Sequence, residues 1–101
     1  MARFDLFRLR GEQGYVVDVQ SNHASTKVRT RVVVPLIPLD ELGKSIEDLN
    51  PIVHVDGRDY AFVAQSLATL TTPEMGECIG SLMHEHGDAF GYALDILLTG
   101  F

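Results

Sequence analysis

The side chains most suited to acid–base or metal chemistry lie in one short stretch, His84-Glu85-His86. In a helix, residues i and i+2 point about 200° apart, and in a strand a third ligand would have to come from elsewhere, so this spacing does not predict a metal site. His54, flanked by two valines, is typical of a hydrogen-bonded strand residue. Cys78 has no cationic neighbour in sequence that would favour its thiolate. With no phosphate loop, nucleophile elbow or paired-carboxylate motif either, the sequence predicts no catalytic residue, no cofactor and no metal.

Six short strands are indicated by apolar and β-branched runs that turn residues separate. The strongest hairpin signal is Asp56-Gly57, because both central residues of such a two-residue turn need positive φ. Pro35 is expected to end the third strand, since proline has no N–H to donate to a ladder. The expected strands cover residues 3–9, 15–21, 29–34, 51–55, 60–64 and 67–72.

A C-terminal helix is expected from about Asp88, which would be its N-cap or an acid of its first turn. Apolar residues then recur at the spacing of one buried stripe, which comprises Phe90, Ala93, Leu94, Leu97 and Leu98. Asp95 lies among them but projects to the opposite side. Residues 22–28 are polar and aperiodic, which predicts a loop or a mobile hairpin tip. Residues 38–42 predict a turn or short helix, and residues 74–83 carry no firm assignment.

These elements predict a single domain, residues 1–101, that is mainly β with a C-terminal α-helix. Short strands joined by turns favour an antiparallel barrel or a curled sheet closed by that helix, because closure removes exposed strand edges. The apolar C-terminal run predicts an end that packs on the core or takes part in binding, since an unpacked end gains nothing that offsets its ordering entropy.

Composition and charge exclude several classes of protein. One cysteine allows no intramolecular disulfide, which fits a reducing cytoplasm. No signal-like segment is present, and no apolar run approaches the ~18 residues that span a bilayer, so we expect neither export nor a membrane association. Residues 1–31 carry six Lys or Arg against three acids, whereas residues 32–101 carry two against eleven, within a net charge of -6. This acidity disfavours tight direct binding to nucleic acid and favours a basic protein partner.

Three segments stand in a characteristic order: Tyr15–Ser21 (YVVDVQS), Arg31–Leu36 (RVVVPL) and Pro51–Val55 (PIVHV). Together with the aromatic start Arg3–Phe7 and the end Thr99–Phe101, they resemble the CcdB family of bacterial toxins over essentially the whole chain. The resemblance implies an SH3-like barrel of the CcdB/MazF type that forms a homodimer. It also implies a cytoplasmic toxin that binds the A subunit of DNA gyrase and traps the cleaved-DNA complex.

The resemblance further implies a CcdA-type antitoxin, whose disordered C-terminal segment wraps the toxin. The pair would repress their own operon, so operator DNA would be contacted only through the antitoxin complex. Carried over residue by residue, the gyrase-binding set comprises Asp95, Thr99, Gly100, Phe101, Phe4, His23 and Ala24. The best-known form of the family ends in Trp-Gly-Ile, has Asn at the position of Asp95, and has bulky apolar residues at the positions of His23 and Ala24. Leu97 and Leu98 are the candidates for the dimer interface.

Two alternatives remain open. A MazF-like ribonuclease toxin would need a base and a cationic group that converge on an RNA phosphate. The basic N-terminal third, including Arg29 and Arg31, favours that reading, and the acidic remainder of the chain opposes it. A non-toxic, degenerate homologue that binds only the antitoxin is the second alternative.

Overall fold

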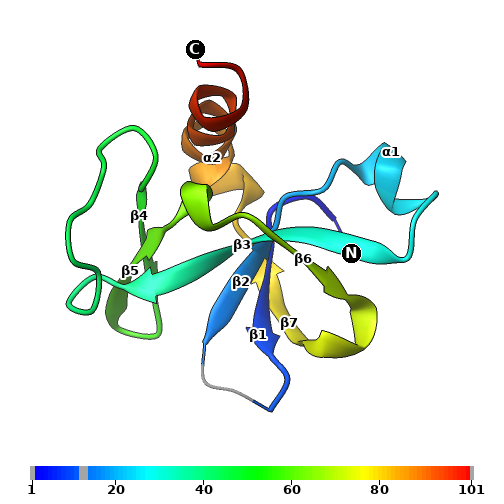
Figure 1. Cartoon of the computed structure of the whole chain (residues 1–101). Coiled ribbons are helices and arrows are strands. Elements are labelled where there is room, and N and C mark those ends of the chain that lie inside the picture. The colour runs from blue at the N-terminus through cyan, green and yellow to red at the C-terminus, as the bar shows by residue number, and fades with distance from the viewer. Residues whose placement is uncertain (1, 12–13, 101) are drawn as a thin grey trace.

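One curled antiparallel sheet and a long C-terminal helix build the molecule (Figure 1). The computed structural model describes residues 2–11 and 14–100. Within them the strands are β1 (Asp5–Leu9), β2 (Tyr15–Asp18), β3 (Thr30–Pro38), β4 (Ile52–Val55), β5 (Arg58–Phe62), β6 (Ala68–Thr71) and β7 (Met75–Ser81). The helices are α1 (Asn22–Ser25) and α2 (Met83–Thr99), and 3-10 turns cover Ala64–Ser66 and Thr72–Glu74. The predicted mainly-β antiparallel fold with a C-terminal helix is confirmed.

Strand β3 organises the sheet because it pairs with three other strands. The order across the sheet is β4-β5-β3-β2-β1-β7, and β6 also pairs with β3. Residues 30–33 of β3 pair with β6, whereas residues 36–38 pair with β5. This change of partner along one strand lets the sheet curl into a half-barrel.

The prediction that Pro35 ends the third strand is wrong, because β3 continues to Pro38. Pro35 lies opposite Val16 of β2, and its carbonyl accepts a hydrogen bond from the N–H of Val63 at 3.1 Å. Its missing N–H falls between the stretch that pairs with β6, which ends at Val33, and the stretch that pairs with β5. Proline is tolerated here because no neighbouring strand needs its N–H.

Helix α2 begins at Met83, so the expectation that it starts near Asp88 is also wrong. The N-cap is Leu82, and Asp88 lies inside the helix. Gly87 does not interrupt the helix. A Cβ added there would lie 2.9 Å from Sδ of Met83 and 3.8 Å from the ring of Phe4. Glycine therefore allows close packing of the helix at this position. The preceding residues, which carried no firm prediction, form β7 at the edge of the sheet.

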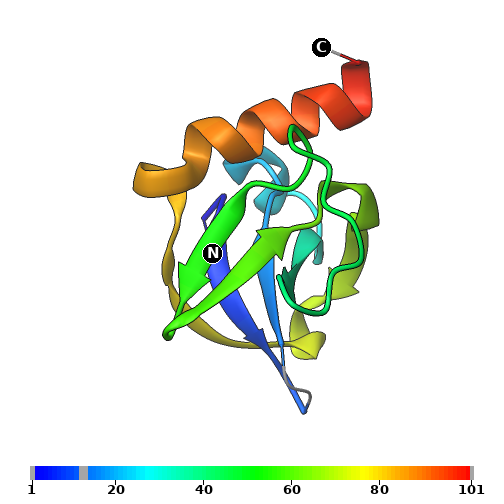
Figure 2. The same cartoon turned by 90° about the vertical axis from the view of Figure 1, so that its left-hand side faces the viewer.

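An aromatic cluster joins α2 to the sheet. The rings of Phe62 and Phe90 stack at 4.0 Å, and Phe4 meets Phe90 edge to face at 5.4 Å. Of the predicted helix stripe, the first three members are buried and Leu97 packs partly against the core, but Leu98 is 66% exposed. Figure 2 shows why: the C-terminal end of α2 rises away from the sheet, so no strand lies beneath the last turn.

Residues 22–28 are not simply a loop, because they begin with the one-turn helix α1. The hydroxyl of Ser21 caps this turn by accepting a hydrogen bond from the N–H of Ala24 at 3.0 Å. Side-chain capping stabilises a turn that has no hydrophobic periodicity, which is why the pattern of apolar residues does not reveal it. Residues 39–41 form a turn, one of the two possibilities expected for that segment.

Candidate functional site

The free end of α2 carries three of the residues that the family resemblance selects. Asp95, Thr99 and Gly100 are exposed, and they follow one another around the last helical turn. Gly100 adopts φ 83°, and its N–H donates to the carbonyls of Asp95 at 3.2 Å and Ile96 at 3.1 Å. The Thr99 hydroxyl also donates to the Asp95 carbonyl, at 2.6 Å. Phe101 lies outside the described residues.

The charge around this end is uniformly acidic in sequence. Arg58 is the last Lys or Arg of the chain, and six acids follow it. Among the described residues no cation lies within ion-pair distance of the Asp95 carboxylate. An exposed carboxylate next to the exposed side chain of Leu98 can receive a cationic and partly apolar partner surface.

Leu97 and Leu98, the candidates for a dimer interface, have different surroundings within one chain. Leu97 packs in part against the core, whereas Leu98 points into solvent. Leu98 is therefore the residue whose apolar surface is open to a second molecule.

Phe4 does not lie on the surface. Its side chain is 2% exposed, and its backbone has an unusual positive φ of 70°. The ring lies between Phe90 and the guanidinium of Arg3, whose Cζ is 4.5 Å from the ring centroid. Phe4 thus positions the start of the chain against α2 and offers no exposed ring to a partner.

His23 and Ala24 lie in α1, apart from the end of α2. In both views α1 sits beside the sheet, while the C-terminal end of α2 rises above it (Figures 1 and 2). His23 is exposed and Ala24 is half-buried. The structure therefore brings Asp95, Thr99 and Gly100 together but not the α1 pair with them.

A buried ion pair lies beneath α1, and the sequence analysis missed it. Nε of Arg31 donates to Oδ2 of Asp18 at 2.9 Å, and Nη2 donates to the same oxygen. Arg31 is 4% exposed and Asp18 is 0% exposed. The other oxygen of Asp18, Oδ1, accepts the N–H of Gln20 at 3.1 Å. The only signal in the sequence for this pair is that Asp18 and Arg31 are charged residues within valine-rich strands, β2 and β3.

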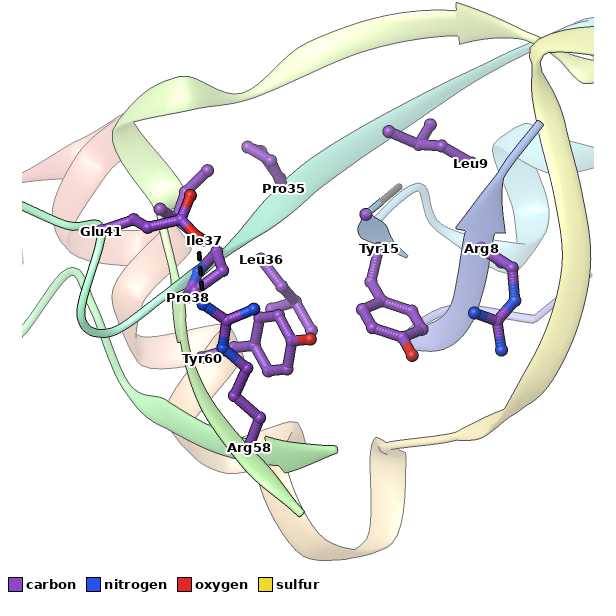
Figure 3. A pocket seen from close by; sticks show the side chains of 11 residues that line it. Arg8, Leu9, Tyr15, Pro35, Leu36, Ile37, Pro38, Glu41, Arg58 and Tyr60 are labelled. Carbon is purple, nitrogen blue, oxygen red and sulfur yellow. Dashed lines mark hydrogen bonds and ion pairs between the residues drawn. The ribbon is translucent and has the colours of Figure 1, made fainter. Parts of the chain in front are cut away.

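A cavity of about 590 Å³ opens on the face of the sheet formed by β1, β2, β3 and β5 (Figure 3). The rings of Tyr15 and Tyr60 meet edge to face at 5.4 Å, with Arg8 beside the first and Arg58 beside the second. Burial raises the pKa of Tyr15, and the hydrogen bond of its hydroxyl to Asp56 raises it further. The phenol is therefore neutral at physiological pH.

The Arg58 side of this cavity is an ion-pair network. Nη2 of Arg58 donates to Asp40 at 2.9 Å and to Glu41 at 3.0 Å. These hydrogen bonds, that to Asp40 first, raise the pKa of Arg58. Glu41 is the carboxylate that lines the cavity, and its engagement with Arg58 leaves it poorly placed to act as a general base.

The histidines serve local structure. His86 stacks on Phe90 with a centroid distance of 5.4 Å, and His84 is exposed on the same first turns of α2. Nδ1 of His54 lies 2.9 Å from Oδ1 of Asp59 in the β4–β5 hairpin.

Within residues 2–11 and 14–100, no three His, Cys, Asp or Glu side chains gather in a way that could hold a metal ion. In the same residues, no helix is long and apolar enough to cross a membrane.

Two endoribonucleases are among the solved structures that share this fold. An endoribonuclease in complex with its cognate antitoxin, from mycobacterial species, has a TM-score of 0.78 at 18% sequence identity, covering 97% of this chain and 94% of its own. An endoribonuclease from mycobacterial species has a TM-score of 0.76 at 19% identity, covering 97% and 90%. At these identities the likeness concerns the fold alone.

No curated protein matches the sequence of this chain. The family model described as CcdB protein, however, matches residues 3–100. That span holds the valine-rich strands, the β4–β5 hairpin and the whole of α2, so the resemblance noted in the sequence is confirmed. The chain belongs to the CcdB family.

Proposed function

We propose that this chain is the toxin of a type II toxin–antitoxin system and that it poisons DNA gyrase by binding its A subunit. The observation that carries the proposal is the CcdB family match over residues 3–100, together with the exposure of Asp95, Thr99 and Gly100 at the free end of α2. A binding inhibitor needs an accessible surface, and these exposed residues offer one.

The gyrase surface is assigned to Asp95, Thr99, Gly100 and Phe101. Asp95 would meet a cationic side chain of gyrase, since the last 43 positions of the chain carry acids but no Lys or Arg. His23 and Ala24 would contribute from the same protomer or from its partner in a dimer. Phe4 would act only indirectly, because its buried ring packs on Phe90 and so helps to position α2.

We further propose a two-fold homodimer, in which the exposed Leu98 of each copy is covered by the other. An isologous interface buries the same apolar surface twice and presents two copies of the α2 end together. Leu97 would extend that interface from the edge of the core.

The neutralising partner is expected to be a CcdA-type antitoxin segment that folds on binding and carries basic residues, and the toxin would reach operator DNA only as part of that complex. Higher salt should then slow association more than it speeds dissociation, because electrostatic steering acts on the on-rate. An on-rate that stays constant from low to high salt contradicts the steering.

The decisive experiment truncates the chain. Deletion of Gly100 and Phe101 removes one helix cap, whose two hydrogen bonds are to exposed carbonyls, so the melting temperature should fall by only a few degrees. The same deletion should abolish gyrase-dependent DNA breakage and growth arrest on induction. Asp95→Ala should weaken gyrase binding by about 1.5 to 3 kcal/mol, the cost of losing a hydrogen bond to a charged group. Asp88→Ala, an exposed acid of the same helix, is the matched control and should leave binding unchanged.

The alternatives give different results in the same assay. A truncated protein that folds normally and still poisons gyrase would show that the end of α2 is not the active surface. RNA cleavage without DNA breaks would identify a ribonuclease, for which Arg29 remains exposed but Arg31 is already paired with Asp18. Antitoxin binding without any growth defect would identify a degenerate homologue.

A further inference from the structure

A second pocket, of about 330 Å³, lies between α1 and the start of β3. Its lining mixes polar and apolar surface and carries no carboxylate, and it consists of Asn22, Ser25, Thr26, Val28, Arg31 and Thr72. Lys27 and Arg29, both exposed, flank it in sequence. The pocket is therefore a cationic and hydrogen-bonding locus on a protein that is acidic as a whole.

The guanidinium of Arg31 is only partly used by its ion pair. Of its five N–H groups, those that bond Asp18 come from Nε and Nη2 and reach a single oxygen, Oδ2. Within the described residues, no buried side-chain nitrogen or oxygen lacks a hydrogen-bond partner. Nη1 has no such partner among them, so it keeps some contact with solvent, and Arg31 lines this pocket. The edge formed by Nη1 and Nη2 is the one that a carboxylate can meet with two parallel hydrogen bonds.

The other polar side chains fix the walls and leave one further donor. The hydroxyls of Ser25, Thr26 and Thr72 each donate to a backbone carbonyl, at 2.9, 2.8 and 3.0 Å. Oδ1 of Asn22 accepts the N–H of Arg3 at 2.8 Å, which leaves its amide nitrogen as the donor that a ligand could use. The pocket thus presents two donors, the Nη1 side of Arg31, a residue that is 4% exposed, and the amide of Asn22.

We propose that this pocket receives the carboxylate of an Asp or Glu side chain from a peptide segment of a partner protein. Because Asp18 already neutralises Arg31, the net attraction for one negative charge comes from Lys27 and Arg29. A nucleic-acid backbone, with its many phosphates, would meet the repulsion of a chain that carries -6 overall, whereas one carboxylate on a peptide would not. The site is separate from the acidic end of α2, so a partner segment that covers both needs an acidic residue here and basic residues there.

The test is a titration followed by NMR of the Arg31 Nε–H and the backbone amides around α1. The probe is the peptide acetyl-Gly-Glu-Gly-amide, and the matched control peptide has Gln in place of Glu. The Glu peptide should give saturable shifts confined to the pocket, and the Gln peptide should give none. Arg29→Gln should weaken binding of the Glu peptide by about two- to fivefold at low salt, since a single exposed charge contributes little to binding.

A tethered competitor gives a test that does not disturb the buried pair. Val28 lines the pocket and is 48% exposed, so Val28→Glu places a carboxylate at its mouth. Because a tethered carboxylate competes at a high effective concentration, Val28→Glu should weaken binding of the Glu peptide more than the uncharged Val28→Gln does. Equal effects of the two substitutions overturn the proposal. Saturable pocket shifts with inorganic phosphate but not with the Glu peptide would also overturn it and would favour a nucleic-acid phosphate. The absence of shifts with either probe would overturn it as well. None of these outcomes depends on gyrase poisoning.

Discussion

Replacing Asp18 by asparagine should destabilise the protein more than any substitution on its surface. The carboxylate is 0% exposed and is the counterion of Arg31, which is 4% exposed and cannot lose its proton. Asparagine retains Oδ1 for the N–H of Gln20 but replaces the negative oxygen that accepts two guanidinium N–H groups. The folded state then contains an uncompensated buried cation.

Breaking a buried ion pair by removing one partner costs about 3 to 5 kcal/mol. A domain of this length has a free energy of unfolding of about 5 to 15 kcal/mol, so the loss is a large part of the total. At about 4 to 8 °C per kcal/mol, the melting temperature should fall by roughly 12 to 40 °C. Asp95→Asn makes the same chemical change at an exposed site, and it should change the free energy of unfolding by no more than about 0.5 kcal/mol.

The measurement is urea unfolding followed by circular dichroism, with the protein concentration held constant because dimerisation adds apparent stability. A double variant, Asp18→Asn with Arg31→Gln, removes both charges and lets the two amides bond each other. It should recover about 1 to 3 kcal/mol relative to Asp18→Asn alone. A loss below about 1 kcal/mol for the single variant, or a double variant no more stable than the single one, refutes the reasoning.

The remaining predictions concern the dimer, acid stability and the helix end. Leu98→Glu should shift the sedimentation coefficient at micromolar concentration toward that of a monomer. Ile46→Glu, at a site that is 47% exposed in the loop between β3 and β4, should not. A monomeric parent protein would contradict the dimer. Hydrogen bonds from the N–H and then the hydroxyl of Thr71 lower the pKa of Glu74, so its contribution to stability is present above the unfolded pKa of about 4.5 and is lost as pH falls through the folded value. Glu74→Gln should therefore flatten the pH dependence of unfolding below about pH 5, and an unchanged profile would rule out this contribution. Gly100→Ala should cost about 1 kcal/mol in thermal unfolding, because φ is 83° there.

Several local features could be predicted because their signals lie within a few residues. The Asp56-Gly57 turn has positive φ at both positions, 50° and 77°, as the two-residue hairpin requires. The buried stripe of the last helix was predicted correctly at Phe90, Ala93 and Leu94, because helical periodicity depends only on spacing. The expected strand end at Pro35 and helix start near Asp88 were wrong, since the role of Pro35 and of the neighbouring Gly87 depends on what another element does opposite each.

The sequence by itself determined the approximate positions of β1 to β6, the acidic charge pattern and the family motifs, because each of these is carried by residue type and spacing. Only the tertiary structure decided which side chains are accessible. It buries Phe4, exposes Leu98 and pairs Asp18 with Arg31 across two strands. Burial and pairing depend on segments that are distant in the chain. The periodicity of apolar residues shows which face of an element is buried but not which other segment packs on that face. For the same reason the pocket beneath α1, whose lining combines residues 22–31 with Thr72, became visible only in three dimensions.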